Sequence, residues 1–218
     1  MANITTEELF QSKSLVLSYL DLRKAIGIIG MTLPFILVLG KIIFESSGIQ
    51  SSISAYYYTV MRDVFVGGLC AIGVFLASYR GYGRIDNIAG NLACVFALGT
   101  AFFPTTPEIS TTISSFIGII HYIFSASLFF TLVFFSLVLF RKTSPNVVLT
   151  PRKEKRNLIY TICGYVILIC MLLIVAVDNM PNNLQLQNLS PVFWLESTSL
   201  IAFGISWFVK GEAILKDK

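Results

Sequence analysis

The chain has 218 residues, of which 55% are hydrophobic and only 13% are charged. About 25% of the residues of a soluble domain are charged, so this composition excludes an ordinary soluble protein and predicts an integral membrane protein. The net charge of +4 does not indicate nucleic-acid binding, because the lysines and arginines stand between apolar runs, as membrane topology requires. We therefore expect membrane lipids, and no nucleic acid, as partners.

Residues 1–24 form a polar lead before the first apolar run. Their apolar side chains recur at roughly helical spacing, which favours an amphipathic helix on the cytoplasmic side. That helix would lie on the membrane surface or pack on the end of a helix bundle. No small-residue cleavage site follows the first apolar run, so we expect this run to remain as a membrane span.

Six apolar runs approach the ~20 residues that a spanning helix needs. They predict an all-α, polytopic membrane protein with a six-transmembrane-helix bundle over residues 25–210, followed by a cytoplasmic tail, 211–218. The runs are Ala25–Phe44, Asp63–Tyr79, Asn87–Phe103, Ser115–Phe140, Asn157–Val177 and Val192–Val209.

Small residues recur four apart in the second and third runs, as in Gly73 and Ala77 or Ala93 and Ala97. Such spacing allows helix backbones to approach closely within a bilayer. We expect these two helices to form the tight centre of the bundle. The same spacing leaves a homo-oligomer open.

The basic residues predict the orientation. Of the 16 lysines and arginines, fourteen lie in the lead, in the second and fourth connections and in the tail. Lys41 and Arg62 alone lie in segments on the other side. The positive-inside rule then places both termini in the cytoplasm of a multi-pass protein of the cell inner (plasma) membrane.

Ionisable residues are costly within a membrane and therefore indicate function. With the predicted orientation, the principal ones lie in the outer-leaflet half, next to a tyrosine-rich segment. There Arg62 would hold an anionic group, while Asp63, His121 and Glu196 would orient it or move protons. The alternative is a structural polar network between the second, fourth and sixth helices. The predicted ligand-binding residues are Tyr57, Tyr58, Arg62, Asp63, His121 and Glu196.

These residues favour a protein that binds or handles a lipid headgroup or small ligand. One alternative is a transporter or channel subunit that uses a polar stripe from Glu196 through Ser199 and Ser206 to Lys210. The other is a lipid-modifying enzyme. We expect no metal or cofactor, because the chain has a single histidine and its four cysteines lie in apolar runs.

Four short motifs carry a resemblance to a known group of proteins. Ser52–Tyr58, Arg62–Gly67, Asp86–Gly90 and Phe103–Thr105 resemble the SISxYYY, RDVFVG, DNxAG and FPT motifs of uncharacterised bacterial and archaeal six-helix membrane proteins. More distantly, Ile53–Tyr58, His121 and Glu196 resemble features of the damage-regulated autophagy modulators and the post-GPI-attachment lipid-remodelling proteins. The resemblance covers most of the chain and implies a lipid-associated function.

Overall fold

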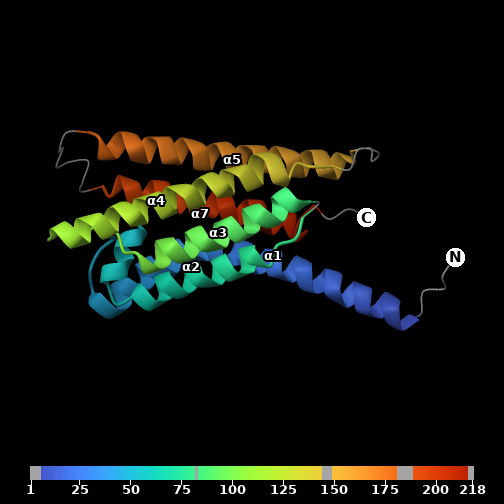
Figure 1. Ribbon diagram of the computed structural model, residues 1–218, viewed down its shortest axis with the longest axis horizontal. Helices are drawn as coiled ribbons and strands as arrows, with labels where there is room; N and C mark the ends of the chain where they lie inside the picture. The colour runs from blue at the N-terminus through green and yellow to red at the C-terminus, as the bar shows by residue number, and fades with distance from the viewer. Residues whose placement is uncertain (1–5, 82, 144–148, 181–188, 216–218) are drawn as a thin grey trace.

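A computed structural model describes residues 6–81, 83–143, 149–180 and 189–215, with side chains from residue 19 onward. The described chain is all-helical and contains no strand (Figure 1), as the sequence predicts. The long helices are α1 (Thr6–Glu45), α2 (Arg62–Ala77), α3 (Arg84–Phe102), α4 (Thr112–Phe134), α5 (Pro151–Asp178) and α7 (Pro191–Lys210). A 3-10 helix, η1 (Ser54–Tyr58), precedes α2, and a π-helix, η2 (Phe135–Leu139), continues α4.

Five segments of the described chain are long and apolar enough to cross a membrane, so the protein is a multi-pass membrane protein. They are Tyr19–Glu45, Arg84–Phe102, Thr112–Leu139, Pro151–Asp178 and Pro191–Lys210. The remaining long helix, α2, has 16 residues, which give about 24 Å of helix. A sixth span therefore stays a prediction.

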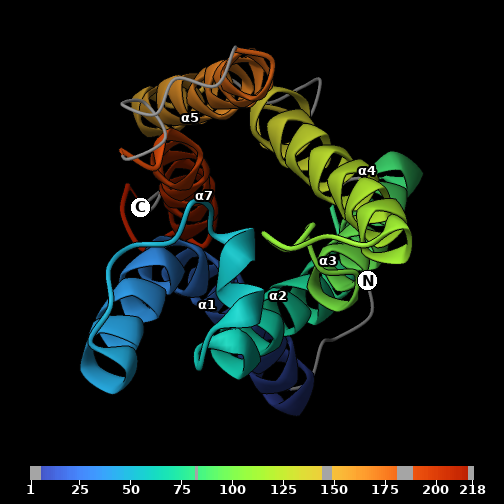
Figure 2. The same ribbon diagram turned by 90° about the vertical axis from the view of Figure 1, so that its left-hand side faces the viewer.

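The six helices form a closed ring. Each helix packs on two neighbours in the order α1, α2, α3, α4, α5 and α7, and α7 packs again on α1. Figure 2 views this ring from one end, with η1 lying across its mouth. Apart from the closing pair, α1 and α7, ring neighbours are also chain neighbours, as short connections favour.

Helix α1 is continuous over 40 residues, which corresponds to about 60 Å. From Thr6 onward the polar lead and the first span are thus one helix, and no break marks residue 24. The early part of α1 extends beyond the rest of the bundle (Figure 1). Residues 1–5 and the side chains of residues 6–18, including Lys13, lie outside the described part, so the expected amphipathic character of the lead stays a prediction.

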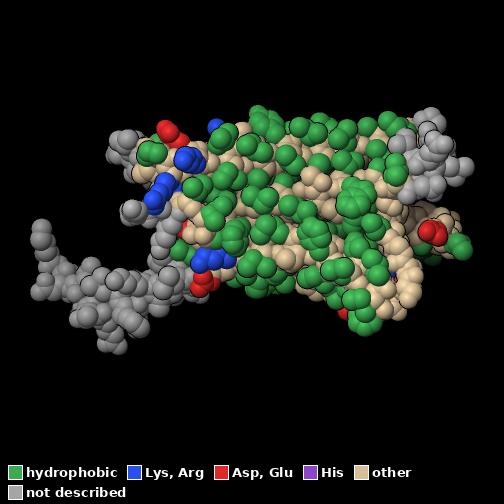
Figure 3. Space-filling view, turned by 180° about the vertical axis from the view of Figure 1, so that it is seen from behind, with side chains coloured by type: hydrophobic (Ala, Val, Ile, Leu, Met, Phe, Trp, Pro, Cys, Tyr) green, Lys and Arg blue, Asp and Glu red, His purple; other side chains and the backbone are tan. Residues whose placement is uncertain are grey.

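Lysine and arginine side chains gather at one end of the ring, here called the basic end (Figure 3). There α2 and α7 end and α3 and α5 begin, and the basic residues at these helix ends and in the following connections include Arg80, Arg84, Lys142, Arg156 and Lys210. Ion pairs and hydrogen bonds join segments there. Lys142 Nζ lies 2.7 Å from the Oδ2 atom of Asp86 at the start of α3. Arg156 donates to the carbonyl of Leu215, 2.6 Å away. Lys216 and Lys218 lie outside the described residues.

Aromatic side chains fill the ring interior toward the basic end. Trp207 is fully buried and its ring centroid lies 5.0 Å from that of Phe140, 5.2 Å from Tyr79 and 5.4 Å from Phe135. These edge-on contacts are favourable aromatic geometries. The opposite end, here called the cavity end, is built differently: it contains η1 and a hollow that is described below.

Two close helix crossings depend on glycine. A Cβ atom added at Gly73 of α2 would lie 3.2 Å from Ala97 Cβ of α3, which confirms the close approach expected for these helices. Gly67 does not contribute to it, because a Cβ there would meet nothing within 4 Å. The crossing of α1 and α7 is also close: a Cβ at Gly204 would lie 2.6 Å from the Gly27 carbonyl oxygen.

Candidate functional site

The tyrosine-rich segment is anchored at the cavity end by its own apolar side chains. Ile53 and Tyr56 are buried in a cluster with Met61 and Phe65. The Tyr56 ring lies 6.2 Å from the ring of Phe193 at the start of α7. Burial of these side chains holds η1 over the mouth of the ring.

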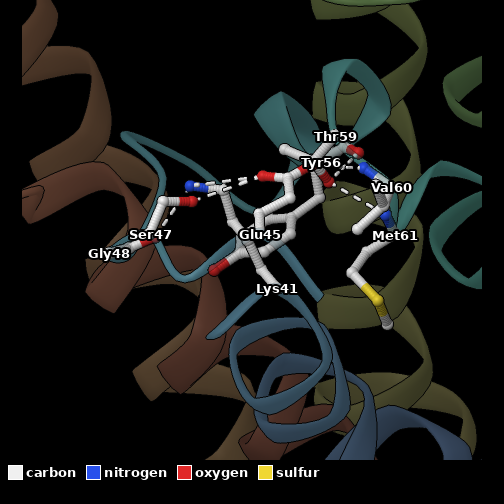
Figure 4. A network of polar contacts seen from close by, with 8 residues as sticks. All are labelled: Lys41, Glu45, Ser47, Gly48, Tyr56, Thr59, Val60 and Met61. Carbon is white, nitrogen blue, oxygen red and sulfur yellow. Dashed lines mark hydrogen bonds and ion pairs between the residues drawn. The ribbon is translucent and has the colours of Figure 1, made fainter. Parts of the chain in front are cut away.

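Hydrogen bonds from α1 fix both ends of the loop that carries η1 (Figure 4). Lys41 is 6% exposed and donates from Nζ to the carbonyl of Gly48, 2.8 Å away. Glu45 Oε1 accepts from the Val60 backbone N–H at 2.7 Å. Lys41 and Glu45 lie one helical turn apart, with 3.9 Å between Nζ and Oε2. Lys41 is thereby committed to holding the loop in place.

Glu196 joins this loop to α7. Its Oε2 atom accepts from the Ile53 N–H at 2.6 Å, and Phe193 N donates to the Ser51 carbonyl at 3.0 Å. Pro191 occupies the first helical turn, where its missing N–H costs nothing. Glu196 is partly buried, and the Ser54 backbone also interacts with its carboxylate.

His121 joins α4 to the end of α3. Its side chain is 2% exposed, and Nδ1 lies 2.6 Å from the Phe103 carbonyl oxygen. A carbonyl oxygen only accepts hydrogen bonds, so Nδ1 carries the proton. In the neutral ring Nε2 is then an acceptor, and the Thr100 backbone also interacts with the ring.

A cavity of about 850 Å³ lies at this end of the ring, and both His121 and Glu196 line it. Its volume is within the range of small-molecule sites. The walls come from the loop with η1, the segment after α3, and helices α4, α5 and α7. The lining residues are Gln50, Ser51, Ser52, Ser54, Ala55, Tyr58, Thr105, Thr106, Pro107, Glu108, Ile109, His121, Tyr122, Ser125, Ala126, Phe129, Met171, Ile174, Val175, Asp178, Asn179, Val192 and Glu196.

The cavity lies where α4 and α5 separate. The two helices come together toward the basic end, where Gly164 of α5 lies against Leu137 and Ser136 of η2. They diverge toward the cavity end (Figures 1 and 2). Lining side chains on both helices are exposed, with Tyr122 at 54% and Val175 at 61%. Part of the cavity lining on these two membrane-spanning helices is therefore accessible, and we expect a ligand to enter between them.

The cavity lining is acidic. It includes the carboxylates of Glu108, Asp178 and Glu196, and no lysine or arginine is among the described residues that form it. The rest of the polar surface comes from hydroxyl and amide groups of residues such as Ser125 and Asn179. This composition can accept hydrogen bonds from a ligand and disfavours an excess of negative charge.

The six predicted site residues separate into two groups. Tyr58, His121 and Glu196 line the cavity, whereas Tyr57, Arg62 and Asp63 do not. His121 and Glu196 are not bonded to one another; each is bonded to the backbone of another segment.

The group outside the cavity lies at the start of α2. Arg62 is exposed and donates from Nη2 to the Tyr57 hydroxyl at 2.8 Å, with its guanidinium 4.4 Å from the ring centroid. Asp63 is exposed beside it. The expected role of Arg62 toward an anionic group stays a prediction.

Tyr58 connects η1 to the far wall of the cavity. Its hydroxyl donates to the Thr105 carbonyl at 2.6 Å. Burial, and secondarily the neighbouring Tyr57, raise the pKa of Tyr58 above its usual value. The phenol is therefore protonated, and a donor, throughout the physiological range.

Several lining residues were missed by the sequence-based prediction. Ser125 lies one helical turn after His121 on α4, and this i, i+4 spacing could have identified it. The predicted topology places Asp178 and Asn179 at the outer end of α5. This is the same membrane depth as that of the predicted site residues, so depth could have identified them. Thr105 and Thr106 had no comparable signal, because their place depends on the path of the chain after α3.

A metal centre is not evident. The described residues contain no group of three or more histidine, cysteine, aspartate or glutamate side chains that could hold a metal ion. Comparisons with known proteins add no assignment: the chain matches no protein-family model, no curated protein and no solved structure. The family resemblance of the short motifs therefore stays a prediction.

Proposed function

We propose that this multi-pass protein lies in the inner (plasma) membrane with both termini in the cytoplasm and binds a lipid headgroup, or a small ligand of the same kind, in the cavity. The cavity would then face the outer leaflet. One observation carries the proposal: His121 and Glu196 line a polar cavity whose lining on α4 and α5 includes exposed side chains. A lipid can place its headgroup in such a cavity while its acyl chains remain in the bilayer.

The packing of α7 favours this function over a transport pathway along that helix. Ser199 and Ser206 are fully buried. Ser199 donates to the Leu195 carbonyl, and Ser206 shares a 3.0 Å hydrogen bond with Ser136 of η2. Trp207 and its aromatic neighbours fill the interior next to them. The polar stripe of α7 is thus engaged in helix packing.

The proposal is tested by obstructing the lateral opening. Ala126 on α4 lines the cavity and is exposed, so Ala126→Trp would fill the space that a headgroup enters. We expect lipid occupancy of the purified full-length protein, measured by native mass spectrometry, to fall about tenfold, which corresponds to ~1.4 kcal/mol. Ala176→Trp on α5 is the matched control, because Ala176 is exposed in the same region but does not line the cavity. Equal lipid retention by both variants would contradict the proposal.

A further inference from the structure

The polar groups that line the cavity indicate which class of ligand it would favour. The groups left available in it are hydrogen-bond acceptors. Phe103 holds the proton of His121 on Nδ1, which leaves Nε2 of this buried ring, whose side chain lines the cavity, as an acceptor. The Glu196 carboxylate accepts from the backbone of Ile53 and Ser54 and also lines the cavity, where its oxygens can accept further hydrogen bonds.

The electrostatics agree with this pattern. Asp178 and Glu108 add two further carboxylates to the lining. The outer basic side chains are engaged elsewhere: Lys41 is bonded to the Gly48 carbonyl, and Arg62 to Tyr57. The outer connection 179–190 contains no lysine or arginine in its sequence. The cavity therefore lacks the cation that an anionic headgroup requires.

We infer that the cavity takes an ammonium-bearing headgroup of an outer-leaflet lipid, held by the acceptors of His121, Glu196 and Asp178. An ammonium group offers N–H donors and a positive charge, which complement these acceptors and carboxylates. The serine and threonine hydroxyls of the lining can donate to the phosphate of a zwitterionic lipid. This inference rests on the proposed function and adds the class of ligand to it.

The experiment is a competition between two lipids that differ only in the headgroup. The purified full-length protein is exchanged into detergent with equal amounts of phosphatidylethanolamine and phosphatidylglycerol of identical acyl chains, and native mass spectrometry measures the retained ratio. We expect at least a severalfold preference for phosphatidylethanolamine. Glu196→Gln should bring the ratio close to one, because a charged hydrogen bond to the ammonium group is lost. Its side-chain oxygen can still accept from Ile53, so the loop remains attached.

Two variants complete the design. Asp178→Asn should reduce the preference in the same direction, and Asp178 is not part of the attachment of the loop to α7. Asp63→Asn removes an exposed carboxylate at the same end but outside the cavity, so its ratio should equal that of the wild type.

The possible results distinguish a failure of the lipid site from a failure of its ammonium selectivity. Retention of neither lipid would overturn the proposed function and the inference with it. Equal retention of both lipids, or a ratio unchanged in Glu196→Gln and Asp178→Asn, would leave the lipid site standing and overturn the ammonium assignment. Displacement of phosphatidylethanolamine by an equal concentration of free ethanolamine would assign the site to a soluble amine instead of a lipid.

Discussion

At the scale of single residues, one hydroxyl connects two segments that are far apart in the chain. Tyr58 of η1 donates to Thr105, which follows α3, and this bond spans one wall of the cavity. A hydrogen bond of this kind contributes about 1 kcal/mol. Burial raises the pKa of Tyr58 in the folded protein. The stabilising contribution of Tyr58 is therefore fully present below the pKa of about 10 that tyrosine has in the unfolded chain, and it is lost as the pH rises through the pKa of the folded state.

Replacing Tyr58 with phenylalanine tests this bond. We expect Tyr58→Phe to lower the free energy of unfolding by about 1 kcal/mol at neutral pH and to reduce the loss of stability above about pH 10. Thermal unfolding of the detergent-solubilised protein across pH 7–11 measures both effects. Tyr165→Phe is the control, because Tyr165 is exposed on α5. A Tyr58→Phe profile that coincides with that of the wild type would show that the bond is not formed.

Single residues of the candidate site differ in how far the sequence alone could predict their roles. His121 and Glu196 were predictable, because a polar group within an apolar run must find a partner or a ligand. Their partners were not, since both are backbone groups of distant segments, Phe103 and Ile53. The predicted topology gives Arg62 and Asp63 the same membrane depth as His121 and Glu196. The position of α2 in the ring nevertheless places them beside Tyr57 and outside the cavity.

At the scale of helices, the α1–α7 crossing closes the ring. Gly27 and Gly204 face one another there, and a Cβ at either position would meet the carbonyl of the other within 2.7 Å. Backbone atoms cannot move aside as a flexible side chain can, so the helices themselves would have to separate. The crossing also supports the site, because α7 carries Glu196.

A matched pair of glycine substitutions tests this crossing. Gly204→Ala should destabilise the protein by roughly 1–3 kcal/mol through overpacking. Gly67→Ala, in α2 with nothing within 4 Å of the new Cβ, should be neutral or slightly stabilising. Thermal unfolding in one detergent compares the two variants with the wild type. Equal melting temperatures for the two variants would refute a close α1–α7 contact.

The sequence located the helices well but not all of their ends. Apolar runs mark the part of a helix that lies in hydrocarbon, whereas capping residues determine where the helix begins. Helix α5 therefore starts at Pro151, six residues before the predicted run, where Thr150 accepts from the Lys153 N–H. Similarly, Thr111 and Ser114 form a capping box that starts α4 at Thr112.

At the scale of the whole molecule, the basic end and the cavity end predict an orientation in the membrane. The connection after α3 should lie outside the cell, and the start of α5 should lie in the cytoplasm. Ile109 is 92% exposed at the cavity end and Lys155 is exposed at the basic end. These two positions can therefore report the orientation of the protein in the membrane.

Cysteine labelling measures that orientation. In a background without the four native cysteines, a membrane-impermeant maleimide should label Ile109→Cys in intact cells and should label Lys155→Cys only after the membrane is opened. Both variants should react equally in detergent, which controls for access within the protein. The opposite pattern would invert the topology and would place the cavity in the inner leaflet.

The division of the ring into a hollow half and an aromatic half has an electrical consequence. At about 30 Å³ for each water molecule, an empty cavity of this volume holds a few tens of waters. Most of the transmembrane voltage then falls across the dry layer around Trp207 and not across the cavity. Carrying one charge through the full potential takes about 2.3 kcal/mol per 100 mV, but a cation that enters from outside would cross little of it. Occupancy of the cavity should therefore depend only weakly on membrane potential, even for a charged ligand.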